Sequence, residues 1–295
     1  MRIYIDEEMK QCIIKDYVSG LSAMKIAKKY LLDERKYHRV IKIISLAGIE
    51  IRDSSQRRQQ YSIDEHVFDN IDTEEKAYMI GFMFADAGRV QNSILICLHQ
   101  RDRHILERFN EILKSNKPIK TYIRYDGSIN NRVDICNKKL CTQLEKLGIV
   151  FRKTFKIRFP TYLDDGLVKH FIRGYFDGDG CLTITKTRNK ALISITSNEM
   201  FCEQLKIHIE KRVNINCLIN PIYGNKCNSQ IKRTVVSGNK QILTFLDWLY
   251  DDATIYLERK YQKYIQLKND PISSKKVKLK QLDVVNPITI PTECI

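Results

Sequence analysis

The stretch AYMIGFMFADAG, residues 77–88, is apolar along most of its length and ends beside a lone carboxylate, Asp86. Such an apolar helix would be buried, and a buried charge without a partner is costly. A second stretch, IRGYFDGDG at residues 172–180, has the same pattern and ends beside Asp179. The two aspartates are 93 residues apart. The pair of stretches therefore predicts a duplicated helix that ends in a carboxylate.

The segments that follow the two stretches also resemble each other. Each is followed by two strand-like segments, an amphipathic helix, a candidate hairpin and a further helix. The first hairpin, residues 120–136, turns at Asp126-Gly127, a dipeptide that favours tight turns. Such self-similarity at a fixed spacing is typical of an internal repeat. We therefore predict an α+β fold of two αββαββα repeats related by a pseudo-twofold axis.

Small residues lie four positions apart on each duplicated helix, as Gly81 and Ala85 in the first copy and Gly174 and Gly178 in the second. Small side chains at this spacing allow two helix backbones to approach closely. If the helices pack along these faces, Asp86 would meet its counterpart at one end of the pair. Two converging carboxylates repel each other unless a cation lies between them, and magnesium prefers such oxygen ligands.

The start of the first duplicated helix carries a capping pattern. The order DTEE, residues 72–75, places Glu75 three residues after Asp72. This spacing is that of a capping box, so Asp72 is the predicted N-cap of the helix.

The chain carries a net charge of +15 and has a pI near 9.3. The excess divides evenly between residues 71–170 and 171–268, with +6 in each. An even spread over two halves suits a track along an anionic nucleic acid, and a solubilising surface charge is the alternative. Together with paired carboxylates, the charge suggests metal-assisted phosphodiester hydrolysis.

The two stretches resemble the motifs of LAGLIDADG homing endonucleases, in the single-chain form with two repeats. The resemblance covers about residues 71–268. It implies a DNA-binding saddle that cuts each strand of double-stranded DNA once and leaves 3′ overhangs. It also implies that Asp86 and Asp179 hold Mg²⁺ (or Mn²⁺), with the backbone carbonyls of Ala85 and Gly178 as further ligands.

The resemblance further implies lysines near the cleft. GIVFRKT and TIYLERKY end the two copies, so Lys153 and Lys260 are the expected catalytic pair, with Lys156 as the competitor in the first copy. Phosphate contact without catalysis is the alternative role. Ala87 stands where the motif usually has glycine, so we expect the turn after the first helix to shift. Asp177, the inner carboxylate of the second motif, is expected to cap or support rather than to bind metal.

The first fifty residues predict three short helices, with Ser22 and Asp33 as caps of the second and third. This order resembles a helix-turn-helix module, and a small helical bundle is the alternative. The third helix, expected from about Glu34 to Leu46, would place a basic face in the DNA groove. Strand alternation adds candidates for base contact. The predicted DNA-binding residues are Arg35, His38, Arg39, Lys42, Lys120, Tyr122, Arg124, Thr183, Thr185, Thr187, Lys232 and Arg233.

We therefore expect a helix-turn-helix domain (1–52), a linker (53–70), two repeats (71–160 and 161–268) and an extended tail (269–295). Nine scattered cysteines without a CxxC pair indicate an intracellular, reducing compartment, and no segment is apolar enough for a membrane. The leading hypothesis is a monomeric, sequence-specific DNA endonuclease. A non-cleaving DNA- or RNA-binding protein on the same fold, such as an intron maturase or a transcription regulator, is the alternative.

Overall fold

The computed structural model describes residues 4–52, 61–185, 190–222 and 230–269. Its helices and strands form an N-terminal helical unit and two repeats of helix, two strands, helix, two strands and helix. The α+β prediction is therefore confirmed. Thr187 and nearly all of the predicted tail lie outside the described residues.

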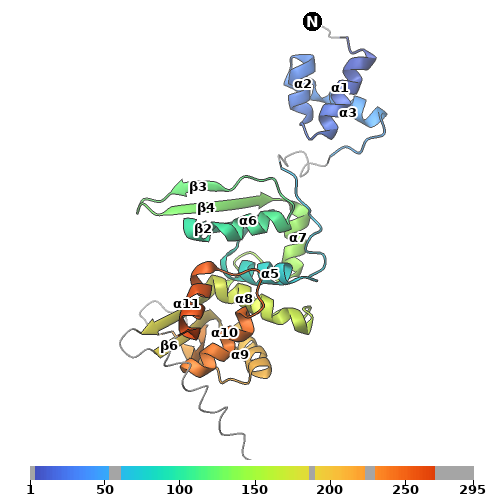
Figure 1. The fold of residues 1–295 in the computed structure, drawn as a ribbon. Coiled ribbons are helices and arrows are strands. Elements are labelled where there is room, and N and C mark those ends of the chain that lie inside the picture. Colours follow the sequence, from blue (N-terminus) through green and yellow to red (C-terminus); the bar gives the residue numbers. More distant parts are fainter. Residues whose placement is uncertain (1–3, 53–60, 186–189, 223–229, 270–295) are drawn as a thin grey trace, which may run out of the picture.

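The N-terminal unit contains α1 (Glu7–Val18), α2 (Ala23–Leu31), a 3-10 turn η1 (Glu34–Lys36) and α3 (Tyr37–Leu46). Ser22 caps α2 by accepting a hydrogen bond from the Lys25 amide. The third helix begins later than predicted, because Asp33 caps the short 3-10 turn instead. The unit has a hydrophobic cluster of its own, separate from that of the repeats, and Figure 1 shows it apart from them.

The first repeat contains α5 (Glu74–Asp86), β1 (Gly88–Val90), β2 (Ser93–His99), α6 (Arg103–Ile112), β3 (Lys120–Ile123), β4 (Ile129–Cys136) and α7 (Lys138–Lys146). Its four strands are antiparallel in the order β1-β2-β4-β3. Gly127 turns the predicted hairpin with a positive φ of 78°, a conformation that favours glycine.

The second repeat contains α8 (Val168–Asp179), β5 (Gly180–Thr185), β6 (Lys190–Asn198), α9 (Glu199–Val213), β7 (Leu218–Pro221), β8 (Ile231–Ser237), α10 (Asn239–Tyr250) and α11 (Glu258–Lys268). Its sheet has the order β5-β6-β8-β7, which is the order of the first sheet. In both sheets the helices cover one face, and we call the other the outer face. One continuous hydrophobic cluster joins the two repeats.

The two motif helices, α5 and α8, lie at the centre of this arrangement. Figure 1 shows them side by side, with β3 and β4 on one side of the pair and β6 on the other. Every residue of α5 from Ala77 to Phe84 is buried, which explains why its sequence is apolar on all sides.

Two further expectations differ from the structure. Residues 61–70, predicted as linker, pack on the first repeat: Phe68 is fully buried, and the amide of Asp64 donates to the Leu113 carbonyl. The helix α5 is capped not by Asp72 but by Thr73, which accepts from the Lys76 amide. Burial of Phe68 stabilises the segment in a way that its polar composition does not reveal.

Candidate metal and nucleic-acid site

Two glycines set the distance between the motif helices. A Cβ atom on Gly81 would lie 2.0 Å from the carbonyl oxygen of Phe171, and one on Gly174 would lie 1.9 Å from that of Tyr78. Real Cβ atoms do not approach so closely, so no side chain larger than hydrogen fits at either position. Because Phe171 and Tyr78 precede the two glycines by the same three residues, the contact is a pseudo-twofold one. The helices run in the same direction, because Gly178 near the end of α8 meets Ala85 near the end of α5.

The parallel packing brings the ends of both helices together. A Cβ on Gly178 would lie 2.3 Å from the Ala85 Cβ and 3.5 Å from a carboxylate oxygen of Asp86. Asp179 follows Gly178 directly and ends α8. The predicted interface residues and the two predicted metal-binding aspartates therefore meet at one place.

Both carboxylates reach the surface, yet protein atoms crowd the sides that face the helices. This partial burial, together with the nearby charge of Asp86, raises the pKa of Asp179 to about 6. Burial also raises the pKa of Asp86, and Lys153 opposes that rise. The two helix C-termini add further negative potential here, since their last carbonyls point toward the same region. The carboxylates and helix ends therefore concentrate negative potential at one place.

Two lysines supply positive charge at this place. The Lys153 ammonium donates to the carbonyls of Met83 (2.7 Å) and Ala85 (2.6 Å) at the end of α5. The Lys260 ammonium, which is buried, donates to the carbonyls of Phe176, Asp177 and Gly180 at the end of α8. The carbonyls of Met83 and Phe176 also accept the amides of Ala87 and Gly180, so each lysine adds a further donor at a helix terminus and stabilises it.

Burial lowers the pKa of both lysines to about 8, and the carboxylates of Asp86 and Asp179 oppose that fall. The competitor Lys156 is directed elsewhere, because its ammonium lies 3.5 Å from the Phe151 carbonyl. The structure therefore brings Lys153, and not Lys156, to the aspartates.

Asp177 lies in the core rather than in the site. Its carboxylate accepts hydrogen bonds from Tyr78 (2.9 Å), Tyr250 (2.6 Å) and the amide of Leu257 (2.7 Å). Burial raises its pKa. A carboxylate saturated by three protein donors joins the two repeats and has no free side for a metal.

Ala87 does not shift the turn, contrary to our expectation. Its φ and ψ are −76° and 133°, close to the −76° and 149° of Gly180 in the second copy. A Cβ on Gly180 would meet the ring of Phe176 at 2.2 Å. The residue equivalent to Phe176 in the first copy is Met83, a flexible side chain that leaves room for the Ala87 methyl.

A hollow of about 270 Å³ opens beside the aspartates. It connects the site to the outer face of the second sheet, because strand residues Thr196 and Ile231 share it with Asp179 and Lys153. A substrate bound across that outer face would therefore reach the carboxylates.

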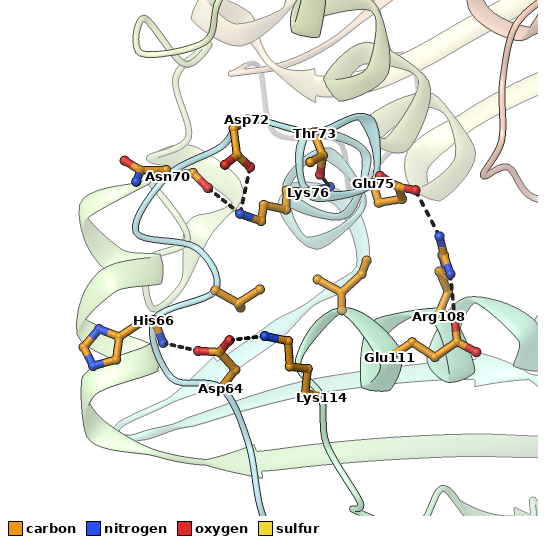
Figure 2. A pocket seen from close by; sticks show the side chains of 12 residues that line it. Asp64, His66, Asn70, Asp72, Thr73, Glu75, Lys76, Arg108, Glu111 and Lys114 are labelled. Atoms are coloured by element: carbon orange, nitrogen blue, oxygen red, sulfur yellow. Dashed lines mark hydrogen bonds and ion pairs between the residues drawn. The ribbon is translucent and has the colours of Figure 1, made fainter.

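A second hollow, of about 480 Å³, lies at the other end of α5 (Figure 2). Its charges are paired with one another. Lys76 contacts Asp72 at 2.7 Å, and Arg108 bridges Glu75 at 3.0 Å and Glu111 at 2.8 Å. Because four carboxylates line this hollow against three basic side chains, it presents no positive surplus to an anionic ligand.

Most of the predicted base-contact residues that can be placed lie on the outer faces or at their edges. Thr183 and Thr185 on β5 are exposed, while Leu182, on the opposite face of that strand, is buried. Lys120 and Tyr122 lie on the outer face of β3, and Arg124 follows the end of that strand. Sequence reasoning missed Arg132, although the alternation of INNRVDIC places it on the face opposite to the buried Val133.

Two predicted base-contact residues lie on opposite faces of the second sheet. Lys232 and Arg233 are neighbours on β8, so their side chains point to opposite faces. Lys232 lies 3.8 Å from Glu199 at the start of α9, on the helix-covered side. Only Arg233 therefore belongs to the outer face.

The basic face of the N-terminal unit is largely accessible. His38 and Lys42 on α3 are exposed, and Arg39 is partly exposed. Arg35 turns back to its own cap, with Nε 3.1 Å from an oxygen of Asp33. The remaining three side chains lie on one helix and can reach an anionic groove.

No group of three or more His, Cys, Asp or Glu side chains within the described ranges could hold a metal by itself. Magnesium commonly takes one or two protein carboxylates and completes its shell with water and phosphate oxygens. The pair of Asp86 and Asp179 fits this pattern. The Ala85 carbonyl, also predicted as a ligand, instead accepts the Lys153 ammonium, so a metal would compete with it for that oxygen.

One segment of the chain is similar to a known protein family. The family model described as "LAGLIDADG-like domain" matches residues 167–249. None of the curated proteins compared with the chain matches it. Similar solved structures include I-WcaI bound to its DNA recognition sequence, at 15% identity over 74% of this chain and 95% of that one, with a TM-score of 0.46.

Two further solved structures are similar to the chain. I-LtrWI bound to target DNA has 12% identity over 74% of this chain and 99% of that one, with a TM-score of 0.44. The N-terminal LAGLIDADG domain of DUF199/WhiA has 18% identity over 63% and 89%, with a TM-score of 0.42. The family match covers the second repeat, and the first sheet has the same strand order: residues 167–249 are similar to a LAGLIDADG-like domain, and the chain contains this topology twice.

Proposed function

We propose that the protein is a sequence-specific endonuclease that hydrolyses both strands of double-stranded DNA with a divalent metal and leaves 3′ overhangs. The observation that carries the proposal is the meeting of Asp86 and Asp179 at the ends of two parallel helices. Two raised carboxylate pKa values at one surface site are typical of a functional site. Since one chain supplies both aspartates, the active form is a monomer.

Asp86 and Asp179 would hold Mg²⁺ or Mn²⁺, and Gly178 could add its carbonyl. A bound ion would polarise the phosphodiester and lower the pKa of a water molecule. Asp177 does not compete with these two aspartates as a metal ligand, because three donors in the core saturate its carboxylate. The hollow beside Asp179 leaves room for a phosphate of the substrate.

The two lysines have different parts in this proposal. Lys153 is only partly buried and lines the hollow, so its ammonium can turn toward a phosphate and stabilise developing negative charge. Lys260 is 3% exposed and contacts three carbonyls, so it holds the end of α8 and thereby positions Asp179. Lys153 is therefore the catalytic candidate, and Lys260 a positioning residue.

DNA contact would extend from the sheets to the N-terminal unit. The outer faces contact the duplex near the cut, and His38, Arg39 and Lys42 of α3 bind a neighbouring groove. No helix in the described part of the chain is long and apolar enough to cross a membrane. The described cysteines are all free thiols, which suits an intracellular, reducing compartment.

One observation favours the second candidate, a non-cleaving DNA- or RNA-binding protein. Lys153 and Lys260 already balance the charge of the two aspartates, and Lys153 occupies the Ala85 carbonyl. A retired nuclease could keep this arrangement as a structural charge cluster. Binding of nucleic acid would then continue without hydrolysis.

Incubation of the full chain with a randomised duplex library distinguishes the two functions. With Mg²⁺ an endonuclease yields selected, cleaved sites with 3′ overhangs, and EDTA abolishes the products. A protein that enriches bound sequences but never cuts them with Mg²⁺ or Mn²⁺ is the non-cleaving binder.

A further inference from the structure

An arginine occupies the same place on the outer face of each sheet. In the first sheet, the register aligns Cys97, Arg132 and Lys120 across β2, β4 and β3. In the second sheet, the register aligns Thr196 on β6, Arg233 on β8 and Asn220 on β7. The strands occupy matching places in the two sheet orders.

The two arginines are also separated from the aspartates by the same number of residues along the paired strands. Gly88, two residues after Asp86, pairs with Leu95, which lies two residues before Cys97 in the arginine row. In the second sheet, Cys181 follows Asp179 by two residues and pairs with Ser194, two before Thr196. The arginines are therefore pseudo-symmetric about the proposed cutting site.

The surroundings of the two arginines differ. Arg132 lies 3.4 Å from the carboxylate of Asp134, which also contacts Lys117 at 3.4 Å and Lys120 at 3.9 Å. The counterpart of Asp134 in the second sheet is Val235: Asp134 pairs with Leu95 on β2, and Val235 pairs with Ser194 on β6. An acidic acceptor in one sheet is thus replaced by an apolar side chain in the other.

Apolar side chains surround Arg233 more widely. Val235 is flanked by Leu218 on β7 and, diagonally, by Leu192 on β6, which are 56% and 42% exposed. Ile231, two residues before Arg233, takes the place that Asn130 has in the first sheet. The Nε atom of Arg233 is buried and has no hydrogen-bond partner among the residues described.

These leucines are exposed on a protein surface that no other described element covers, and Ile231 and Thr196 join it to the hollow at Asp179. Because the same surface opens onto the cutting site, its occupant is the substrate. Apolar side chains can contact the methyl group of thymine, and arginine binds the O6 and N7 atoms of guanine with two hydrogen bonds. A carboxylate accepts from the N4 amino group of cytosine.

We propose that Arg132 and Arg233 read guanines at mirrored positions of the two half-sites, and that their unlike neighbours make the target asymmetric. Thymines flank the guanine in the half bound by β5–β8. A cytosine flanks it in the half bound by β1–β4, where Asp134 accepts from its amino group. This inference rests on the proposed DNA function and names the substrate that the function requires.

The first experiment selects duplexes bound by the full chain in Ca²⁺, without requiring cleavage, from a randomised library. We expect a consensus with guanines at equal distances from its centre, on opposite strands, and with thymines beside only one of them. A consensus without mirrored guanines overturns the inference while sequence-specific binding stands. A library that yields no consensus overturns the proposed function as well.

The second experiment assigns each half-site with single-atom changes in the selected duplex. Replacing guanine by 7-deazaguanine removes the N7 acceptor, and replacing thymine by deoxyuridine removes only the methyl group. The variants Arg132→Lys and Arg233→Lys keep the charge but lose the planar fork that binds guanine with two hydrogen bonds. Each variant should lose roughly 5- to 150-fold in affinity for the intact target.

The decisive result is the coupling between protein and base. The R132K variant should no longer respond to 7-deazaguanine in one half but should respond normally in the other, and R233K should show the reverse. The wild-type protein should lose affinity on deoxyuridine substitution in one half only, the half bound by β5–β8. Leu192→Ser should abolish that loss. Equal responses in both halves overturn the inference. Unchanged affinity for random duplexes shows that each variant is folded.

Discussion

A Cβ atom on Gly174 would lie 1.9 Å from the carbonyl oxygen of Tyr78. The reciprocal distance, from a Cβ atom on Gly81 to the carbonyl oxygen of Phe171, would be 2.0 Å. These two contacts hold the motif helices parallel and at minimum separation, and so bring together the carboxylates that follow them. The proposed chemistry depends on this backbone contact more than on any single side chain.

We predict that Gly81→Ala or Gly174→Ala lowers the free energy of unfolding by about 3 kcal/mol, because overpacking against a backbone carbonyl cannot be relieved by a rotamer change. Chemical denaturation measures the effect. Gly166→Ala is the matched control, since a Cβ there meets nothing within 4 Å. A Gly174→Ala protein as stable as the control would contradict the close packing.

Asp86→Asn and Asp179→Asn should each reduce cleavage of the selected target by at least about 100-fold while leaving duplex affinity nearly unchanged, because the amide removes a charged ligand. Single-turnover cleavage and a binding titration in Ca²⁺ measure the two effects. Asp252→Asn, at a surface pair with Lys169, serves as the control. If either variant cuts at the wild-type rate, the aspartate that it replaces is not a metal ligand.

Asp179→Asn should also raise the stability of the metal-free protein. The pKa of Asp179 is about 6 in the folded protein, against 3.8 for an ordinary aspartate, so the folded state binds the proton more tightly. Stability is therefore lost as pH rises from about 4 to 6, and the full cost remains above 6. Because the carboxylate is partly exposed, we expect a gain of about 1 kcal/mol at pH 8.

At pH 4 the same substitution should change the melting temperature far less, since the folded wild-type protein then carries a protonated carboxyl and loses little stability to ionisation. Thermal melts of both proteins at the two pH values, with EDTA, measure the difference. A gain at pH 4 that equals the gain at pH 8 would show that ionisation of Asp179 is not its cause.

Replacement of each lysine by methionine should affect stability and cleavage to different degrees. Lys260→Met removes the ammonium that three carbonyls at the end of α8 share and should cost about 3 kcal/mol of stability. Lys153→Met should cost less stability but lower single-turnover cleavage more strongly at matched folded fraction. The opposite order of effects would reverse the assignment of Lys153 as the catalytic lysine.

Removal of residues 1–52 should weaken DNA affinity without moving the cut. The N-terminal unit has a core of its own, so its loss leaves the repeats intact. Each phosphate contact that is lost should lower the slope of log affinity against log salt by about 0.9. Salt-dependent titration and mapping of the cut ends measure both. A displaced cut would assign the N-terminal unit to the cutting site.

Several features of the protein could be predicted from the sequence because they depend on local pattern. The repeat, the order of elements and the turn at Asp126-Gly127 follow from hydrophobic periodicity and turn chemistry. The small residues and aspartates on both motif helices could be found by their equal spacing. The linker was predicted too long, because burial of Phe68 depends on a surface that only the folded repeat provides.

The sequence by itself determined the duplicated α+β fold and the identity of the paired carboxylates. Only the tertiary structure decided which lysine meets them, that Asp177 is saturated in the core, and that Lys232 and Arg233 face opposite ways. It also decided that Ala87 fits, because Met83 leaves space where Phe176 does not. These outcomes depend on contacts between residues distant in the chain, and no local pattern encodes those distances.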